Sequence, residues 1–150
     1  MRVDFPPLRK GGAIVNLVTN DMVKLSKVAL YGSDGRKEAG KKGENYFQVE
    51  DPTAEPGMHY VVVVEGRGEG MEVNAFWQRR KGVTGNPWRW FVPGQGIALK
   101  PIGAGRIRGE AVVSVPEGVD TIAVQVMFHP ESGRDDPMVD KMFIGKVPVL

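Results

Sequence analysis

One stretch of the chain, residues 56–81 with the sequence PGMHYVVVVEGRGEGMEVNAFWQRRK, constrains the fold more than any other. Its first half, residues 58–65, follows a Pro-Gly turn signal and contains four consecutive valines, which favour an extended, well-packed backbone. Its second half, residues 71–80, alternates between apolar and polar side chains. The link between them, residues 66–70, is rich in glycine and suits positive φ values. The sequence therefore predicts two strands joined by a glycine-rich connection.

The alternation in the second of these strands gives its two sides different chemistry, because successive side chains of a strand point to opposite faces. The core side carries Val73, Ala75 and Trp77. The other side carries polar and aromatic residues, namely Glu72, Asn74, Phe76, Gln78 and Arg80. We expect this second side to be left uncovered and free to contact a ligand.

Short apolar runs separated by glycine and proline recur along the rest of the chain, which contains 20 glycines and 11 prolines. Residues 1–12 are expected to be a linker or lead-in. Residues 20–30 fit either a short capped helix or a strand at their end, and we favour a strand over residues 26–31. The further predicted strands cover residues 13–19, 26–31, 44–50, 95–100, 106–115, 120–129 and 138–149. The pattern predicts an all-β chain, with one antiparallel β-sandwich of about eight or nine strands over residues 13–150.

The composition excludes several classes of function. A formal net charge of +2 on 150 residues is too even for a protein built to bind nucleic acid. The chain has no apolar run of membrane-spanning length and no signal peptide at its start, although a removed export signal would leave no trace. The lack of cysteine excludes disulfides and thiolate metal sites.

A series of residues distributed from residue 44 to the C-terminus carries a family resemblance. The series is Pro56-Gly57 with Tyr60, Val73-x-Ala75-x-Trp77, Val115-Pro116-Glu117-Gly118-Val119, Val124-x-Val126, and Val139-Asp140 with Ile144 and Val147. Its order and spacing resemble the galactose-binding-like jelly roll found in many carbohydrate-binding modules. The resemblance implies a jelly-roll sandwich that binds a polysaccharide or oligosaccharide. It also implies an extracellular or cell-surface location, beside an adjoining catalytic domain.

Members of that group often hold a structural calcium between an aspartate of the last strand and an acidic residue near the N-terminus. Here Asp140 is followed by Lys141, and residues 13–19 offer no acidic partner. We therefore expect neither a metal nor another cofactor.

The chemistry that sugars require is present on the predicted strands outside the core. Sugars present hydroxyl groups and apolar C–H faces, which planar amides, arginines, carboxylates and aromatic rings recognise. If the apolar residues of the strands face the core, one opposite face carries Asn74, Phe76, Gln78, Arg80, Arg108, Glu110 and Gln125. This set is the predicted ligand-binding surface; the alternative interpretation is an ordinary solvated sheet face.

Trp88 and Trp90 form a second candidate. In an extended segment their indoles would project to the same side, with Arg89 opposite. Such a pair can stack on sugar rings or contact a partner protein. Alternatively, one or both fill the edge of the sandwich core.

Two polar loops have weaker functional interpretations. The loop of residues 129–136 gathers His, Glu and two Asp residues, which could hold a divalent cation but lack the spacing of calcium loops. The basic loop of residues 32–43 fits either an anion site or a solvated hairpin connection. The chain contains no nucleophile–base, zinc-protease or phosphate-loop motif, so we expect no enzymatic activity.

The sequence thus predicts a non-catalytic carbohydrate-binding module. One alternative is a structural or protein-interaction sandwich, docked to a catalytic domain or to copies of itself through Trp88, Trp90 and Phe91. A viral coat-type jelly roll would explain the basic loop of residues 32–43. It would also call for a long basic arm, which this chain does not have.

Overall fold

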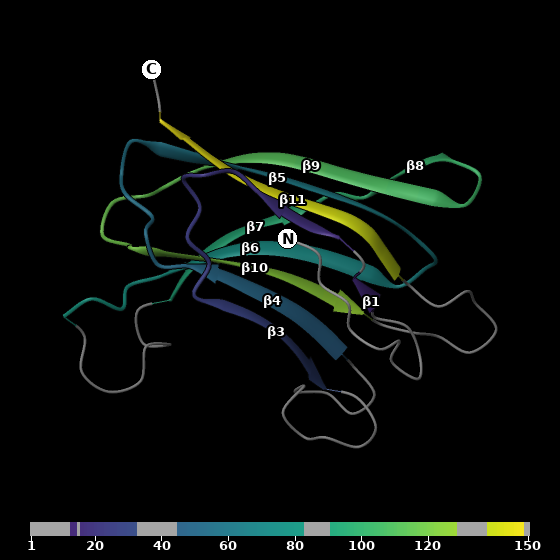
Figure 1. Cartoon of the computed structure of the whole chain (residues 1–150), viewed down its shortest axis with the longest axis horizontal. Helices are drawn as coiled ribbons and strands as arrows, with labels where there is room; N and C mark the ends of the chain where they lie inside the picture. The colour runs from purple at the N-terminus through teal and green to yellow at the C-terminus, as the bar shows by residue number, and fades with distance from the viewer. Residues whose placement is uncertain (1–12, 15, 33–44, 83–90, 129–137, 149–150) are drawn as a thin grey trace.

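The structure, a computed structural model, describes residues 13–14, 16–32, 45–82, 91–128 and 138–148. These residues contain eleven strands and no helix, arranged in two sheets that pack face to face as a β-sandwich (Figure 1). The all-β prediction is therefore confirmed. The lead-in, residues 1–12, lies outside the described residues.

The first sheet has five antiparallel strands in the order β3-β4-β10-β6-β7. Its strands are β3 (Lys27–Gly32), β4 (Asn45–Asp51), β10 (Thr121–Phe128), β6 (Met71–Gln78) and β7 (Phe91–Ile97). Apolar side chains alternate along its three central strands, so one face of the sheet is apolar and packs into the core. That inner face presents the buried residues Phe47, Val49, Val73, Ala75, Trp77, Ile122, Val124, Val126 and Phe128.

The second sheet has six strands, with the path β1-β11-β5-β9-β8 and with β2 also paired to β11. Its strands are β1 (Ala13–Ile14), β2 (Leu17–Thr19), β5 (Met58–Arg67), β8 (Lys100–Gly103), β9 (Arg106–Ser114) and β11 (Met138–Pro148). The short strands β1 and β2 run parallel to β11, and the other pairings are antiparallel. Its inner face contributes Leu17, Tyr60, Val62, Val64, Val113, Met142 and Ile144 to the same core.

The two strands predicted for residues 56–81 lie in different sheets: β5 in the six-stranded sheet and β6 in the five-stranded one. Gly68 and Gly70, with φ values of 87° and 85°, allow the chain to cross between the layers. The stretch therefore joins the two halves of the sandwich.

The predicted strand over residues 95–100 is confirmed only in part: residues 95–97 belong to a strand that begins earlier, residues 98 and 99 lie outside any strand, and a separate strand begins at residue 100. The chain instead forms β7 and then β8, which, with the division of residues 13–19 into β1 and β2, exceeds the expected eight or nine strands. The proline and glycine at residues 93 and 94 hid the earlier start of β7. At Gly94 the reason for glycine is steric, because a Cβ there would lie 1.7 Å from the Ala75 carbonyl oxygen, where the pairing of β6 with β7 is irregular.

Candidate functional site

The outer face of the five-stranded sheet carries a row of three amide side chains. The strand register places Gln125 of β10 directly opposite Gln48 of β4 on one side and Asn74 of β6 on the other. On the flanking strands the same row continues with Ala29 and Gly96, which are small. The sheet therefore presents adjacent amides across its three central strands, with no bulky neighbour in that row.

Hydrogen bonds fix the amide groups of this row. Gln125 Nε2 donates to Gln48 Oε1 at 3.1 Å, and Gln48 Nε2 donates to Glu50 Oε2 at 2.7 Å. Asn74 Nδ2 donates to Glu72 Oε1 at 3.2 Å, while its Oδ1 lies over Gly96, 3.5 Å from where a Cβ would be. The donors and acceptors of the row are thus held in defined orientations.

An ionic cluster adjoins the row. Glu50 is fully buried, and its carboxylate lies 2.7 Å from Arg80 Nη2 and 3.5 Å from Lys27 Nζ. Arg80 Nε also donates to Gln78 Oε1 at 2.8 Å. Gln78 is fully buried, and its Nε2 has no hydrogen-bond partner in the described part of the chain. The Glu50 carboxylate is thus ion-paired with two cations, while Glu50 Oε1 and Gln78 Nε2 are both buried without a hydrogen-bond partner in the described part of the chain.

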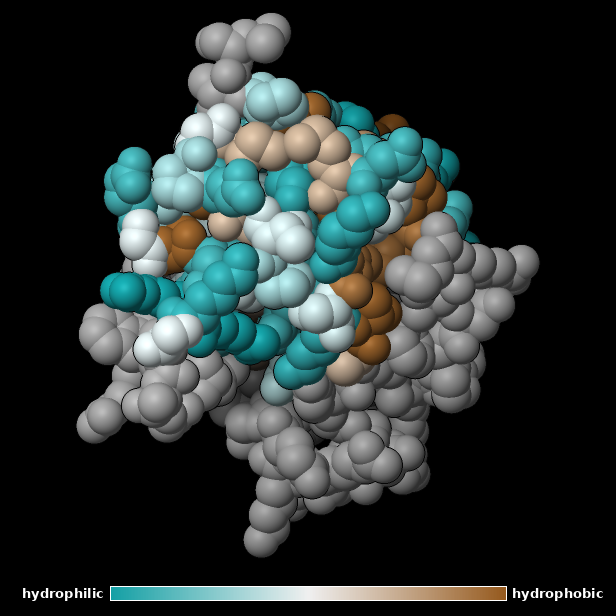
Figure 2. Space-filling view, turned by 60° about the vertical axis from the view of Figure 1, so that its left-hand side comes forward, coloured by the Kyte–Doolittle hydropathy of each residue, from teal (hydrophilic) through white to brown (hydrophobic). Residues whose placement is uncertain are grey.

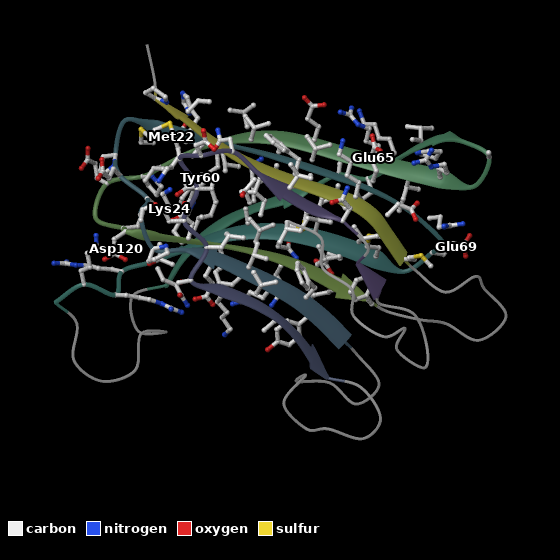
Figure 3. All side chains as sticks on the ribbon, in the orientation of Figure 1. Met22, Lys24, Tyr60, Glu65, Glu69 and Asp120 are labelled. Atoms are coloured by element: carbon white, nitrogen blue, oxygen red, sulfur yellow. The ribbon has the colours of Figure 1, made fainter. Side chains whose placement is uncertain are left out.

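Asp120, at the turn before β10, positions the backbone that carries Arg80. Its carboxylate accepts hydrogen bonds from the N–H groups of Arg80 at 3.1 Å and Lys81 at 2.8 Å, and from the Thr121 hydroxyl at 2.7 Å. Burial by itself would raise the pKa of Asp120, but these hydrogen bonds outweigh it and hold the pKa below its ordinary value. Figure 3 shows Asp120 at one end of the sandwich, while Glu65 and Glu69 lie toward the other end.

Figure 2 turns this end of the molecule forward and shows that hydrophilic side chains dominate its described surface. Lys27 and Arg80 have 35% of their side chains exposed, and Asn74 and Gln125 are partly exposed. The expectation that this side of β6 is uncovered is wrong for Phe76 and Gln78, which are buried. For Gln78 one cause is Arg80, whose side chain folds back over the strand to reach both Gln78 and Glu50.

The structure does not place Arg108 and Glu110 on this face. Both belong to β9, which pairs with β5 in the other sheet, so the single shared face expected from the sequence is wrong. Arg108 there makes ion pairs with Glu65 at 3.1 Å and Glu110 at 2.9 Å. Of the predicted set, Asn74, Phe76, Gln78, Arg80 and Gln125 do share the outer face of the five-stranded sheet.

Several other predictions fall outside the described residues: those on Trp88 and Trp90, on the loop of residues 129–136, and on residues 33–43 of the basic loop. Asp140, the position considered for calcium, pairs with Arg67 at 3.1 Å. Within the residues that the structure describes, no three His, Asp or Glu side chains are grouped to hold a metal ion. Nor does that part of the chain contain a helix able to cross a membrane.

A second polar cluster lies between the two sheets. Asp51, at the end of β4, accepts a hydrogen bond from the Tyr60 hydroxyl at 2.8 Å and lies 3.6 Å from Lys146 Nζ. Thr53 donates to Asp51 and accepts from Lys146. Burial, and then the bond to Asp51, raise the pKa of Tyr60 far above its ordinary value, so the phenol stays neutral. Because the charges and the phenol are all paired, the cluster fits a structural link between sheets.

Sequence reasoning missed Gln48, Glu50 and Lys27 as site residues. The sequence does indicate that two of them lie on the outer face, because Gln48 and Glu50 alternate with the core residues Phe47 and Val49 in β4. Lys27 depends on how β3 pairs with β4, which local sequence does not encode.

No family of known proteins, no curated protein and no solved structure was found to match the chain. The chemistry of its own residues must therefore indicate what the outer face of the five-stranded sheet does.

Proposed function

We propose that this protein is a non-catalytic carbohydrate-binding module with a jelly-roll sandwich, and that its ligand lies across the outer face of the five-stranded sheet. The observation that carries the proposal is the row Gln48–Gln125–Asn74 on three adjacent strands. Solvation of an outer sheet face does not require that amide side chains lie opposite one another on neighbouring strands. Gln48 is buried and holds Gln125 through a hydrogen bond, so the partly exposed Gln125 and Asn74 are left side by side as the amides that a ligand can reach.

The hydrogen-bonding capacity left in this row matches sugar hydroxyls. Within the described residues, Gln125 and Asn74 each make one side-chain hydrogen bond, as donors. Each therefore keeps one N–H and one carbonyl oxygen, and both side chains are partly exposed. A sugar hydroxyl both donates and accepts, so it can pair with each of these amides.

The expected affinity is modest. A hydrogen bond exchanged with water contributes only about 0.5–1.5 kcal/mol, and the buried Gln48 and Gln78 offer little further contact. We expect dissociation constants of order 10–1000 μM for short oligosaccharides. Such a module adds avidity to a larger protein that acts on polysaccharide. The jelly-roll likeness supports that setting, with an adjoining catalytic domain outside the cell.

Calorimetric titration against a panel of plant, algal and bacterial polysaccharides tests the proposal. The variants Asn74→Ala and Gln125→Ala each remove part of the row at a partly exposed position, so the fold should survive. We expect each to weaken binding roughly two- to tenfold. Glu110→Ala, on the other sheet and 52% exposed, is the matched control and should bind like the wild type.

The proposal fails if no polysaccharide binds, or if a bound one is unaffected by both amide variants. Circular dichroism of each variant establishes that a loss of binding is not a loss of fold. Equal losses in Glu110→Ala and in the two amide variants would also count against this face.

We propose self-association as a second candidate function, because an apolar patch lies on the outer face of the six-stranded sheet. Val61 lies opposite Val112, and Val63 opposite Phe143. Val112 is 58% exposed, which is unusual for a residue in the middle of a sheet. Because acidic and basic side chains alternate beside the patch at Glu65, Arg108 and Glu110, a second copy of the chain could match it.

Light scattering with mass determination separates the two candidates. Self-association predicts a dimer that Val112→Glu converts to a monomer, since the added charge would be buried at the interface. A monomer at all concentrations would exclude this second candidate and leave carbohydrate binding unaffected.

A further inference from the structure

The Arg80 side chain crosses the outer face of the five-stranded sheet. It starts just after β6 and its guanidinium reaches Glu50 of β4, so it passes over β10, the strand between them. The β10 residues opposite Gln78 and Glu50 are Thr121 and Ala123, whose short side chains are fully buried. The guanidinium therefore lies over a short section of β10, with Gln78 on one side and Glu50 on the other.

Two buried polar atoms next to this guanidinium have no hydrogen-bond partner in the described part of the chain. Arg80 Nε donates to Gln78 Oε1 at 2.8 Å, which leaves Gln78 Nε2 as an unpaired donor. Glu50 Oε1 lies 2.7 Å from Arg80 Nη2 but accepts no hydrogen bond, so the N–H groups are not aligned with it. Arg80 thus balances the charge of Glu50 without satisfying the hydrogen-bonding capacity of the two groups beneath it.

The Arg80 side chain can turn away from these groups while its backbone stays in place. The Asp120 carboxylate accepts the backbone N–H of Arg80 at 3.1 Å, whereas the Arg80 side chain is 35% exposed and adjoins solvent. A partly exposed ion pair adds little stability, so a ligand can replace it. Glu50 would keep its ion pair with Lys27 at 3.5 Å and its hydrogen bond from Gln48.

The two unpaired atoms define which chemical group can take the place of the guanidinium. Gln78 Nε2 donates a hydrogen bond, and Glu50 Oε1 accepts one. A hydroxyl both accepts and donates, whereas an oxyanion only accepts and an ammonium only donates. An oxyanion would also meet the negative charge of Glu50. One hydroxyl, or two on adjacent carbons of a sugar ring, therefore complements this pair, and the group is neutral.

We propose that the Arg80 side chain turns outward when a glycan binds, and that hydroxyls of a neutral sugar then occupy its place at Glu50 Oε1 and Gln78 Nε2. This inference rests on the carbohydrate-binding function proposed above. Ala123 is two residues from Gln125 in β10 and faces the same side of the sheet. The sugar over Ala123 is therefore the neighbour of the sugar on the amide row, and Arg80 covers its position in the free protein.

Calorimetric titration of the whole chain with a neutral galactomannan, compared with the variant Arg80→Met, tests the displacement. We expect Arg80→Met to bind about three- to tenfold more tightly, because the ligand no longer has to displace the guanidinium. The same variant should be less stable, since Glu50 loses a counter-ion. Tighter binding by a less stable variant is a result that a purely structural role of Arg80 would not give.

Polygalacturonate tests the chemistry of the ligand. Each of its sugars carries a carboxylate, which would face the carboxylate of Glu50 once Arg80 has turned outward. We expect it to bind the wild type at least about tenfold more weakly than galactomannan does.

Two further variants complete the test. Arg108→Met is the matched control, because Arg108 is a 39% exposed arginine of the other sheet that also pairs with glutamates, at 3.1 and 2.9 Å. Its affinity for galactomannan should equal that of the wild type. Arg80→Lys keeps a cation beside Glu50, so it should fold even where Arg80→Met does not. A single ammonium cannot hold Gln78 and Glu50 as a guanidinium does, so this variant should also bind more tightly.

The possible failures are distinct. If galactomannan binds but neither Arg80 variant binds it more tightly, or if Arg108→Met gains as much, the displacement of Arg80 is wrong and glycan binding stands. Polygalacturonate binding as tightly as galactomannan would overturn the neutral ligand chemistry. If neither polymer binds the wild type or a variant, the inference is overturned, and the panel of polysaccharides described above decides separately whether the carbohydrate-binding function fails as well.

Discussion

Glu50 is a buried carboxylate on the outer face of a sheet, a position at which most sequences place a solvated residue. Its charge is balanced by Arg80 and Lys27 and by a hydrogen bond from Gln48. Gln78 beside it keeps an unpaired amide nitrogen, which costs about 1–3 kcal/mol of stability. The buried charge and the unpaired amide nitrogen each make an unfavourable contribution to the free energy of folding. Such contributions are common where residues serve binding.

Removing one partner of the Glu50 ion pair should destabilise the fold. Arg80→Ala leaves the buried carboxylate with Lys27 alone as counter-ion, and we expect a loss of about 2–3 kcal/mol, below the usual range because Arg80 is partly exposed. Arg80→Ala combined with Glu50→Gln should recover part of that loss, because the uncompensated charge is gone. Urea unfolding of both variants measures the difference; equal stabilities would show that Glu50 is not the cause.

Asp120 should make stability depend on pH. Its pKa is lower in the folded protein, so the unfolded chain takes up the proton first as the pH falls. Its stabilising effect is therefore complete above the unfolded pKa of about 3.9 and disappears as the pH falls through the folded value. Asp120→Asn should cost about 1 kcal/mol or less at pH 7, and the deficit should shrink by pH 3. Urea midpoints at both pH values test this, and a constant deficit would contradict it.

At the scale of the strand, alternation made most of the five-stranded sheet predictable. Strands β4, β6 and β10 alternate apolar and polar residues, so their core residues and the placement of Asn74 and Gln125 could be predicted. The start of β7 and the existence of β8 as a separate strand could not be predicted, because Gly94 and Pro101 resemble loop residues until their contacts with neighbouring strands are known. Arg108 was misplaced because sheet membership depends on distant pairing, which no local pattern encodes.

Gly94 and Gly96 offer a matched test of the β6–β7 pairing. A Cβ at Gly94 would meet the Ala75 carbonyl oxygen at 1.7 Å, whereas one at Gly96 would meet only Asn74 Oδ1 at an ordinary 3.5 Å. We expect Gly94→Ala to destabilise the protein by roughly 1–3 kcal/mol and Gly96→Ala by less than about 0.5 kcal/mol. Thermal unfolding of the two variants measures this. Similar midpoints would mean that β7 does not approach β6 as closely as described.

At the scale of the whole molecule, the two sheets are joined by an apolar core and by the cluster of Asp51, Tyr60 and Lys146. Asp51 comes from the five-stranded sheet, and the other two come from the six-stranded one. The Lys146 ammonium also lies 5.9 Å from the centroid of the Tyr60 ring. The sequence predicted two packed layers but not this polar link, because buried charges cannot be paired from sequence alone.

Breaking this link should lower global stability without altering the outer face. Tyr60→Phe deletes the hydroxyl bonded to Asp51 and should cost about 1–3 kcal/mol, because the carboxylate is fully buried. Val112→Thr, at an exposed position on the same sheet, should change stability by less than about 0.5 kcal/mol. Guanidinium unfolding measures the stability of both variants. A Tyr60→Phe variant with the same free energy of unfolding as the wild type would show that the cluster does not hold the sheets together.

The claim on which the functional account depends is that a glycan lies across the outer face of the five-stranded sheet. Nuclear magnetic resonance of the side-chain amide groups during titration with an oligosaccharide from a polysaccharide that binds the chain tests it most directly, because Asn74 and Gln125 report on the face themselves. We predict saturable shifts of these two amide signals, with the backbone signals of Val61 and Val112 on the opposite sheet unchanged. Saturable shifts confined to Val61 and Val112, or none at either face, would contradict the account.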